Sequence, residues 1–165
     1  MLYFGNREKT YLFETKRSLR AADGYLYLGL ADEALEELAA VRAEDQLEAV
    51  VLLAKIRALL HLRRWKDAET LSAEGAELHK REEEFTVQRA FALHQQREGA
   101  KAVEVLLAAP EWIQKTGILH YNLACYEARL GDLNAARQCI DAAIQINAAI
   151  KKSAKADPDL EALWN

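Results

Sequence analysis

The residues of this sequence best suited to nucleophilic or metal chemistry are its histidines and cysteines. They are His61, His79, His94, His120, Cys125 and Cys139. A zinc site on helices needs two ligands three or four residues apart, or a Cys-x-x-Cys pair. No two of these residues have that spacing. We therefore expect neither a metal site nor a cofactor.

Covalent catalysis is not predicted either. Cys125 follows His120 by five residues, whereas a nucleophile and its base on one helix need a spacing of three or four and a third group that orients the base. The sequence has no Gly-rich phosphate loop. The run Glu82-Glu83-Glu84 is expected to begin a helix, where carboxylates complement the helix dipole. We predict no catalytic residue, and Cys125 is expected to be a buried structural thiol.

The composition favours helices as the elements that position these side chains. The 165 residues are 51% hydrophobic and 29% charged, with only two prolines and seven glycines. Such a chain can bury a substantial core within one domain, and so few helix breakers argue against an all-β or disordered chain. No apolar run reaches the roughly 18 to 20 residues that cross a bilayer, and the N-terminus lacks the order of a signal peptide. The expected compartment is the cytoplasm.

An internal repeat of 34 residues organises most of the chain. Four alanines stand at this spacing: Ala34, Ala68, Ala102 and Ala136. Four residues after each alanine come Leu38, Ser72, Leu106 and Ile140, and twelve residues before each come Ala22, Ile56, Ala90 and Ala124. Offsets of three, four and seven recur around each alanine and mark one face of an α-helix. The pattern predicts closely packed antiparallel helix pairs.

This repeat resembles the tetratricopeptide repeat family, whose unit is 34 residues. The clearest copy runs from Tyr121-Asn122-Leu123-Ala124-Cys125-Tyr126 through Leu130-Gly131-Asp132 to Ala136. The first copy has Gly29 at the same turn, whereas the middle two have Arg63 and Arg97 there. The proline that commonly ends a repeat of this family is replaced by Gln46, Lys80, Gln114 and Ala148. The resemblance implies an all-α, right-handed α-solenoid of about four helical hairpins with a short C-terminal capping helix.

The helix boundaries can be predicted from the repeat. We expect a basic and aromatic N-terminal extension over residues 1–14, the four repeats over 15–148 and a C-terminal cap over 149–165. Asp157-Pro158 is a typical N-cap and first helical residue for a short final helix. Pro110 prevents the sixth helix from continuing. The expected helices span residues 7–28, 32–43, 46–62, 65–79, 83–96, 99–109, 115–130 and 133–150.

The resemblance also implies a binding groove, because the first helix of each hairpin lines the concave face in this family. The implied partner-binding residues are Tyr27, Leu53, Arg57, His61, Phe91, His94, Tyr121, Asn122 and Arg129. Apolar side chains mixed with arginines suit an extended peptide or an amphipathic helix. An alternative is that the chain's own terminal helix fills part of the groove. Members that hold chaperone tails use a carboxylate clamp, which is absent here because its places hold Leu19, Asp23, Ala54, Glu84 and Gln88.

The N-terminal stretch is a second candidate for interaction. The net charge is −4, yet residues 1–20 carry five basic and two acidic residues, a balance of +3 that leaves −7 for the remainder. Basic and aromatic side chains together can contact an anionic membrane or an acidic protein surface. The alternative is that the aromatics only cover the first repeat. The basic residues are Arg7, Lys9, Lys16, Arg17 and Arg20.

These observations favour a non-catalytic adaptor or scaffold that binds a protein or peptide in its groove. The alternative function is a peripheral linker between a membrane or cytoskeletal filament and a partner protein, similar in role to bacterial kinesin-light-chain-like proteins. An enzyme is the least supported class, because no pair of titratable groups can be placed in a cleft. The mild net charge argues against nucleic acid as a partner. A homodimer stays open, since both ends and the groove could be covered by a second copy.

Overall fold

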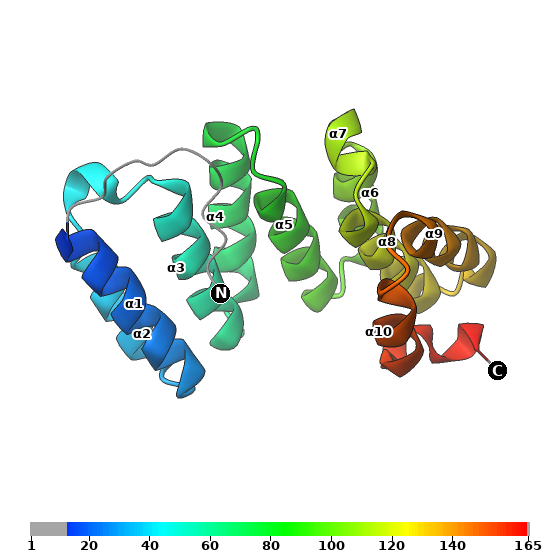
Figure 1. Ribbon diagram of the computed structural model, residues 1–165, viewed down its shortest axis with the longest axis horizontal. Helices are drawn as coiled ribbons and strands as arrows, with labels where there is room; N and C mark the ends of the chain where they lie inside the picture. Colours follow the sequence, from blue (N-terminus) through cyan, green and yellow to red (C-terminus); the bar gives the residue numbers. More distant parts are fainter. Residues whose placement is uncertain (1–12, 165) are drawn as a thin grey trace. The chain divides into compact units, whose positions relative to one another are not determined.

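The computed structural model describes residues 13–164, and every regular element among them is helical (Figure 1). The chain divides into two compact units, the first ending at Leu62 and the second beginning at Arg63. The first unit contains α1 (Phe13–Tyr27), α2 (Ala31–Ala39), the 3-10 helix η1 (Ala43–Asp45) and α3 (Ala49–His61). The second contains α4 (Trp65–Leu78), α5 (Glu83–Gln95), α6 (Gly99–Leu107), α7 (Glu111–Gln114), α8 (Gly117–Leu130), α9 (Leu133–Ile146), α10 (Ile150–Ala156) and the 3-10 helix η2 (Pro158–Leu163).

The eight predicted helices correspond to α1 to α6, α8 and α9. The predicted start of the first helix at residue 7 lies outside the described residues. Three predicted ranges were too long by three or more residues. The second helix ends at Ala39 and not at residue 43, because a turn and η1 follow it. The third helix begins at Ala49 and not at residue 46, because η1 and a turn come before it. The eighth ends at Ile146, because Asn147 is extended and its side chain accepts a hydrogen bond from the backbone N–H of Ala149 (3.0 Å).

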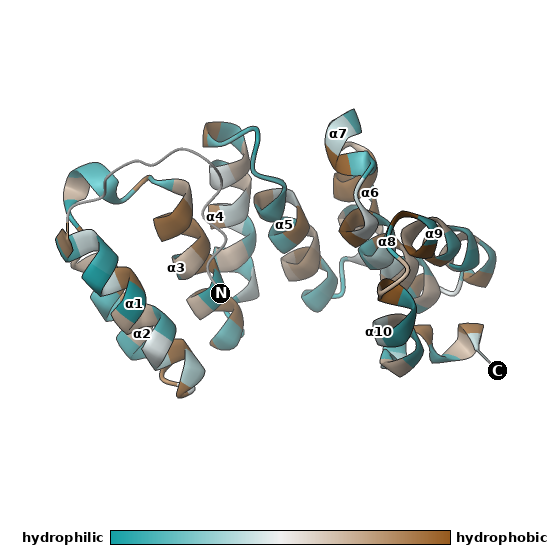
Figure 2. Ribbon diagram, in the orientation of Figure 1, coloured by the Kyte–Doolittle hydropathy of each residue, from teal (hydrophilic) through white to brown (hydrophobic). Residues whose placement is uncertain are grey.

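Within the first unit, α1 packs on α2, and α3 packs on both. Their common core contains Leu19, Ala22, Ala34, Leu38 and Val51, all buried. Figure 2 shows α3 largely in the hydrophobic colour, in keeping with its run of aliphatic residues. In the second unit, α4 packs on α5, α5 on α6, α6 on α8, and α8 on α9. Consecutive helices therefore pack side by side within each unit, as the repeat predicts.

The repeat register coincides with the core. Ala34, Ala68, Ala102 and Ala136 are all fully buried. The residues four positions later and those twelve positions earlier are fully buried as well. Ser72, the polar member of the set, donates its hydroxyl hydrogen to the carbonyl of Ala68 (2.7 Å), so the buried oxygen is satisfied. Small side chains at the alanine positions let neighbouring helices approach closely.

The turn between the two helices of each predicted hairpin contains a residue with a positive φ in all four copies. This φ is 77° at Gly29, 56° at Arg63, 64° at Arg97 and 93° at Gly131. Left-handed backbone suits glycine, which has no Cβ, and is unfavourable for arginine. The middle copies therefore keep the turn of the family pattern although their residue type opposes it.

Glutamine side chains replace two of the missing prolines at the repeat ends. The Gln114 amide donates to the carbonyls of Leu107 (3.0 Å) and Ala109 (2.7 Å), at the end of α6. Gln46 does the same after α2, donating to the carbonyls of Ala39 (3.2 Å) and Val41. Because the last carbonyls of a helix have no partner within the helix, these side chains act as C-terminal caps.

Candidate functional site

Two predicted groove residues of the last repeat, Tyr121 and Arg129, lie on one face of α8 together with Cys125. The three residues follow one another at a spacing of four, so they share this face of the helix. His94 of α5 lies beside them, its ring stacked on Tyr126 with centroids 4.5 Å apart. We call Tyr121, Cys125, Arg129 and His94 the α8 face. Residues 157–164, which we call the C-terminal segment, fold back onto it: η2 packs on α8 as well as on α9 and α10.

Asp157 joins the C-terminal segment to the first half of the α8 face. The Tyr121 hydroxyl donates to its Oδ2, and the Cys125 Sγ lies 3.7 Å from the same oxygen. The other oxygen, Oδ1, accepts the backbone N–H of Asp159 (2.9 Å), which confirms the predicted N-cap. Burial, reinforced by the Asp157 carboxylate, raises the pKa of Cys125 to about 12. The same two causes raise the pKa of Tyr121 above its ordinary value. Both groups are therefore neutral at pH 7.

Asp159 joins the segment to the second half of the α8 face. Its Oδ1 accepts a hydrogen bond from Arg129 Nη1 at 3.0 Å, and its Oδ2 lies 3.9 Å from His94 Nε2. The His94 side chain is only 11% exposed. Burial lowers the pKa of His94, an effect that the carboxylate of Asp159 opposes and the charge of Arg129 increases. The neutral imidazole is thus favoured at neutral pH.

Apolar side chains anchor the same segment in the core of the second unit. Leu160 is fully buried and Leu163 nearly so. The Trp164 indole donates to the carbonyl of Ala154 (3.1 Å), and the cations of Arg137 and Lys155 lie 5.8 and 5.9 Å from the centre of its ring. Such cation–π contacts are each favourable by about 0.5–1 kcal/mol at exposed sites. The segment is held by buried leucines at its end and by charged contacts at its start.

The other predicted groove residues of the second unit are engaged within their own helices or with near neighbours. The Phe91 ring meets Trp65 edge to face, with centroids 6.4 Å apart. The Asn122 amide donates to the carbonyl of Ile118, one turn earlier in α8 (2.8 Å). These two residues do not contact the C-terminal segment through any interaction found among the described residues.

In the first unit the predicted groove residues are more open. Arg57 of α3 donates from Nη2 to Asp23 of α1 at 2.9 Å, which links the first helices of two successive repeats. Leu53 is half-buried, His61 is exposed, and Tyr27 is 91% exposed. Arg57 is thus the only predicted groove cation of this unit, and its charge is partly compensated.

The described part of the basic N-terminal candidate lies on the exposed side of α1. Lys16, Arg17 and Arg20 are all exposed, and they form no ion pair with another residue in the range 13–164. Phe13 at one end of the helix is 77% exposed, and Tyr27 at the other is also open. We call these five residues the α1 stripe. Arg7 and Lys9 lie outside the described residues.

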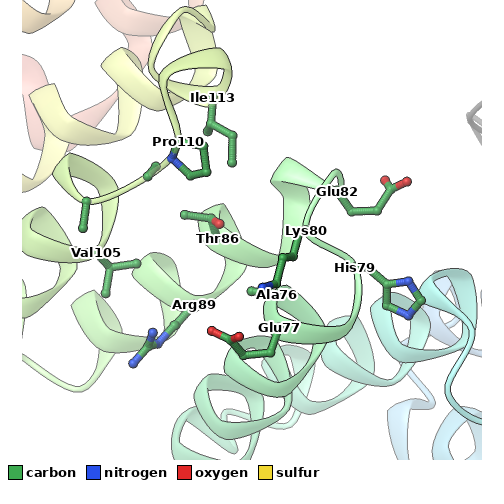
Figure 3. A pocket seen from close by; sticks show the side chains of 12 residues that line it. Ala76, Glu77, His79, Lys80, Glu82, Thr86, Arg89, Val105, Pro110 and Ile113 are labelled. Carbon is green, nitrogen blue, oxygen red and sulfur yellow. The ribbon is translucent and has the colours of Figure 1, made fainter.

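The second unit also contains a cavity of about 360 Å³ that the sequence did not indicate (Figure 3). It lies where the end of α4, α5 and the α6–α7 connection meet, with Val105, Pro110 and Ile113 on its apolar side. Arg89 at its edge is held by Glu69, 3.3 Å away. Charged side chains line the rest of the cavity, among them Glu77, Lys80 and Glu82.

In the part of the chain that the structure describes, no group of three or more His, Cys, Asp or Glu side chains is placed to hold a metal ion. No helix in that part has the length and apolar character needed to cross a membrane.

The contacts of Asp157 and Asp159 with the α8 face are not predicted from the sequence. The sequence predicts a capping segment at this end, and a groove partly filled by the chain's own terminal helix is one of its two alternatives. The available signal was weak: two aspartates in a segment that follows a repeat whose first helix carries Arg129. Nothing in the spacing paired them with individual residues of α8.

Known proteins resemble this chain in structure and not in sequence. The sequence matches no protein-family model and no curated protein. Among solved structures, MamA of MSR-1 superposes with a TM-score of 0.66 at 17% identity, covering 83% of this chain and 79% of that one. MamA residues 41 to the end from Desulfovibrio magneticus RS-1 give 0.68 at 17% identity, with 82% and 77% covered. These structures are tetratricopeptide-like helical solenoids, so the predicted fold class is confirmed.

Proposed function

We propose that this chain is a member of the tetratricopeptide repeat family that acts as a non-catalytic adaptor, binding an extended segment of a partner protein on the first helices of its hairpins. The observation that carries the proposal is the C-terminal segment on the α8 face. Residues predicted to bind a peptide, namely Tyr121, Arg129 and His94, are the ones that contact an acidic segment of the chain itself. Their side chains are therefore suited to polypeptide recognition.

The open groove residues of the first unit extend the same proposal. Tyr27 and His61 are exposed, and Arg57 offers a charge that is 37% exposed beside Asp23. Exposed aromatic and arginine side chains are typical of residues that dominate binding energy in protein interfaces.

A pull-down tests the adaptor function. The variant Arg57→Glu, Arg129→Glu reverses both groove cations, and partners that need the groove should be lost or reduced by about tenfold, as expected when close charge pairs become repulsive. The matched control is Arg63→Glu, Arg97→Glu, which makes the same change in net charge at exposed turn residues. Circular dichroism verifies that both variants are folded. Partners retained equally by both variants would contradict the proposal.

A second function, linkage to an anionic surface, is favoured by the α1 stripe. Three exposed cations, which form no ion pair within residues 13–164, lie on α1 between two exposed aromatic rings. Such a set is a suitable contact for anionic lipid, where each cation contributes roughly 1 kcal/mol. The variant Lys16→Gln, Arg17→Gln, Arg20→Gln should then lose most sedimentation with phosphatidylserine vesicles, whereas Lys151→Gln, Lys152→Gln, Lys155→Gln should retain it. Equal sedimentation of both variants would exclude this role for the stripe.

A further inference from the structure

The C-terminal segment contacts the second unit in two different ways. Leu160 and Leu163 fill the core, as any terminal cap of a repeat stack must do. Asp157 and Asp159 do something that a cap does not require: they place two carboxylates on side chains of first helices, at Tyr121, Arg129 and His94. An apolar cap would exclude water equally well without these polar contacts.

The carboxylates are positioned as a recognition motif. Asp157 is fixed by its own turn, because its Oδ1 accepts the N–H of Asp159. This turn directs Oδ2 at the Tyr121 hydroxyl, while Asp159 reaches Arg129 at 3.0 Å. Charge-assisted hydrogen bonds of this kind are shorter and roughly twice as strong as neutral ones. The α8 face therefore matches two aspartates separated by one residue.

The surface also remains accessible at its edge. The Arg129 side chain is 62% exposed and that of Asp159 is 28% exposed. Solvent can thus reach the ion pair, and a competing carboxylate can approach Arg129 before the segment leaves. Displacement can then begin at Asp159 and need not begin at the buried leucines.

We propose that the α8 face is a recognition site for acidic segments of the form Asp-x-Asp-Leu in a partner protein, and that the chain's own Asp157–Leu160 occupies it as an internal competitor. The proposal rests on the adaptor function proposed above and adds the chemistry of the partner and a means of control. Partner segments bind by replacing the internal aspartates, so affinity in the intact chain is lower than the site alone would give.

A disulfide can hold the internal segment in place. Because Cys125 Sγ lies 3.7 Å from Asp157 Oδ2, Asp157→Cys brings a second sulfur within reach of Cys125. The variant is made with Cys139→Ala, so that only one pair can form, and mass spectrometry verifies the bond. The probe is a fluorescein-labelled peptide with the sequence of residues 156–164, and fluorescence anisotropy measures its binding to the full chain with and without dithiothreitol.

We expect the reduced variant to bind the peptide at least about tenfold more tightly than the oxidised variant, because the internal competitor is then free and lacks one carboxylate. The double variant Asp157→Asn, Asp159→Asn, which keeps the turn and needs no disulfide, should likewise bind more tightly than the wild type. Adding Arg129→Glu, or replacing both aspartates of the peptide by asparagine, should abolish binding.

Two results would overturn the proposal: equal peptide binding by the oxidised, reduced and double-asparagine forms, or binding that persists with Arg129→Glu. The adaptor function is judged separately by the pull-down. If peptide binding fails while partners still depend on Arg57 and Arg129, only the acidic motif and its internal competitor are wrong. If the peptide behaves as expected while partners ignore the groove, the adaptor function is wrong.

Discussion

Replacing Arg97 by glycine should make this protein more stable, although it removes a whole side chain. Arg97 occupies the turn between α5 and α6 with a φ of 64°. A residue with a Cβ pays about 1–2 kcal/mol for left-handed backbone. Glycine avoids that cost but adds about 0.4–1 kcal/mol of conformational entropy to the unfolded chain. The difference predicts a net gain of about 0.5–1 kcal/mol.

The structure shows no interaction that would offset this gain. Arg97 is exposed and makes no ion pair or side-chain hydrogen bond with another residue in the range 13–164. Its backbone N–H donates to the carbonyl of His94 (3.0 Å), a bond that glycine keeps. Unfolding in urea, followed by circular dichroism at 222 nm, measures the change. For a chain of this size the melting temperature should rise by roughly 1–4 °C.

Two matched variants separate backbone strain from the loss of the arginine side chain. Arg97→Ala removes the side chain but keeps the Cβ, so the free energy of unfolding should change little. Gly131→Ala makes the reverse change at the equivalent turn, where φ is 93°, and should destabilise by about 1–2 kcal/mol. If Arg97→Gly were no more stable than Arg97→Ala, the turn would carry no strain and the reasoning would be refuted.

Four further substitutions test other parts of the structure. Gly75→Ala should destabilise the protein by about 1–3 kcal/mol in a denaturant titration, because the added Cβ would lie 2.3 Å from the buried Phe85 ring. Gly24→Ala should stabilise it by roughly 0.5–1 kcal/mol, because the added Cβ would enter open space. Gln114→Ala should cost about 1 kcal/mol through the lost cap, and a neutral result would show that water replaces the amide. Because burial lowers the pKa of His94 in the folded state, the unfolded chain binds its proton more readily. Stability should then be full above about pH 6.5 and fall as the pH drops through the lower folded-state pKa, a slope that His94→Gln should reduce.

The helices could be predicted from the sequence because the same residue pattern occurs in four copies. Ser72 stands where the other copies have Leu or Ile, yet the register of Ala68 still placed it in the core, where it is fully buried. The repeat also predicts the turn at Arg63, although arginine is unfavourable in left-handed backbone. Agreement among copies outweighs the local preference of any one residue.

The contacts of the C-terminal segment could not be predicted for a complementary reason. Asp157 accepts a hydrogen bond from Tyr121, which lies 36 positions earlier in the chain. The C-terminal segment has no equivalent in the repeats, so no second copy of the sequence reveals this pairing. The four-residue helix α7 was missed too, because one turn after Pro110 is too short to show a period. Sequence periodicity thus identified the face of α8 but not what covers it.

The common turn geometry has a consequence for how such a chain can change in length. Each hairpin turn has a residue with left-handed backbone at the same position of the repeat, at Gly29, Arg63, Arg97 and Gly131. A cut at one of these positions can therefore be joined to the same position of the next turn, where the backbone is also left-handed. Deletion or duplication of 34 residues keeps every core alanine in register, whereas a change that is not a multiple of 34 shifts the register of the alanines that follow it. A chain of this kind is expected to gain or lose length in whole repeats.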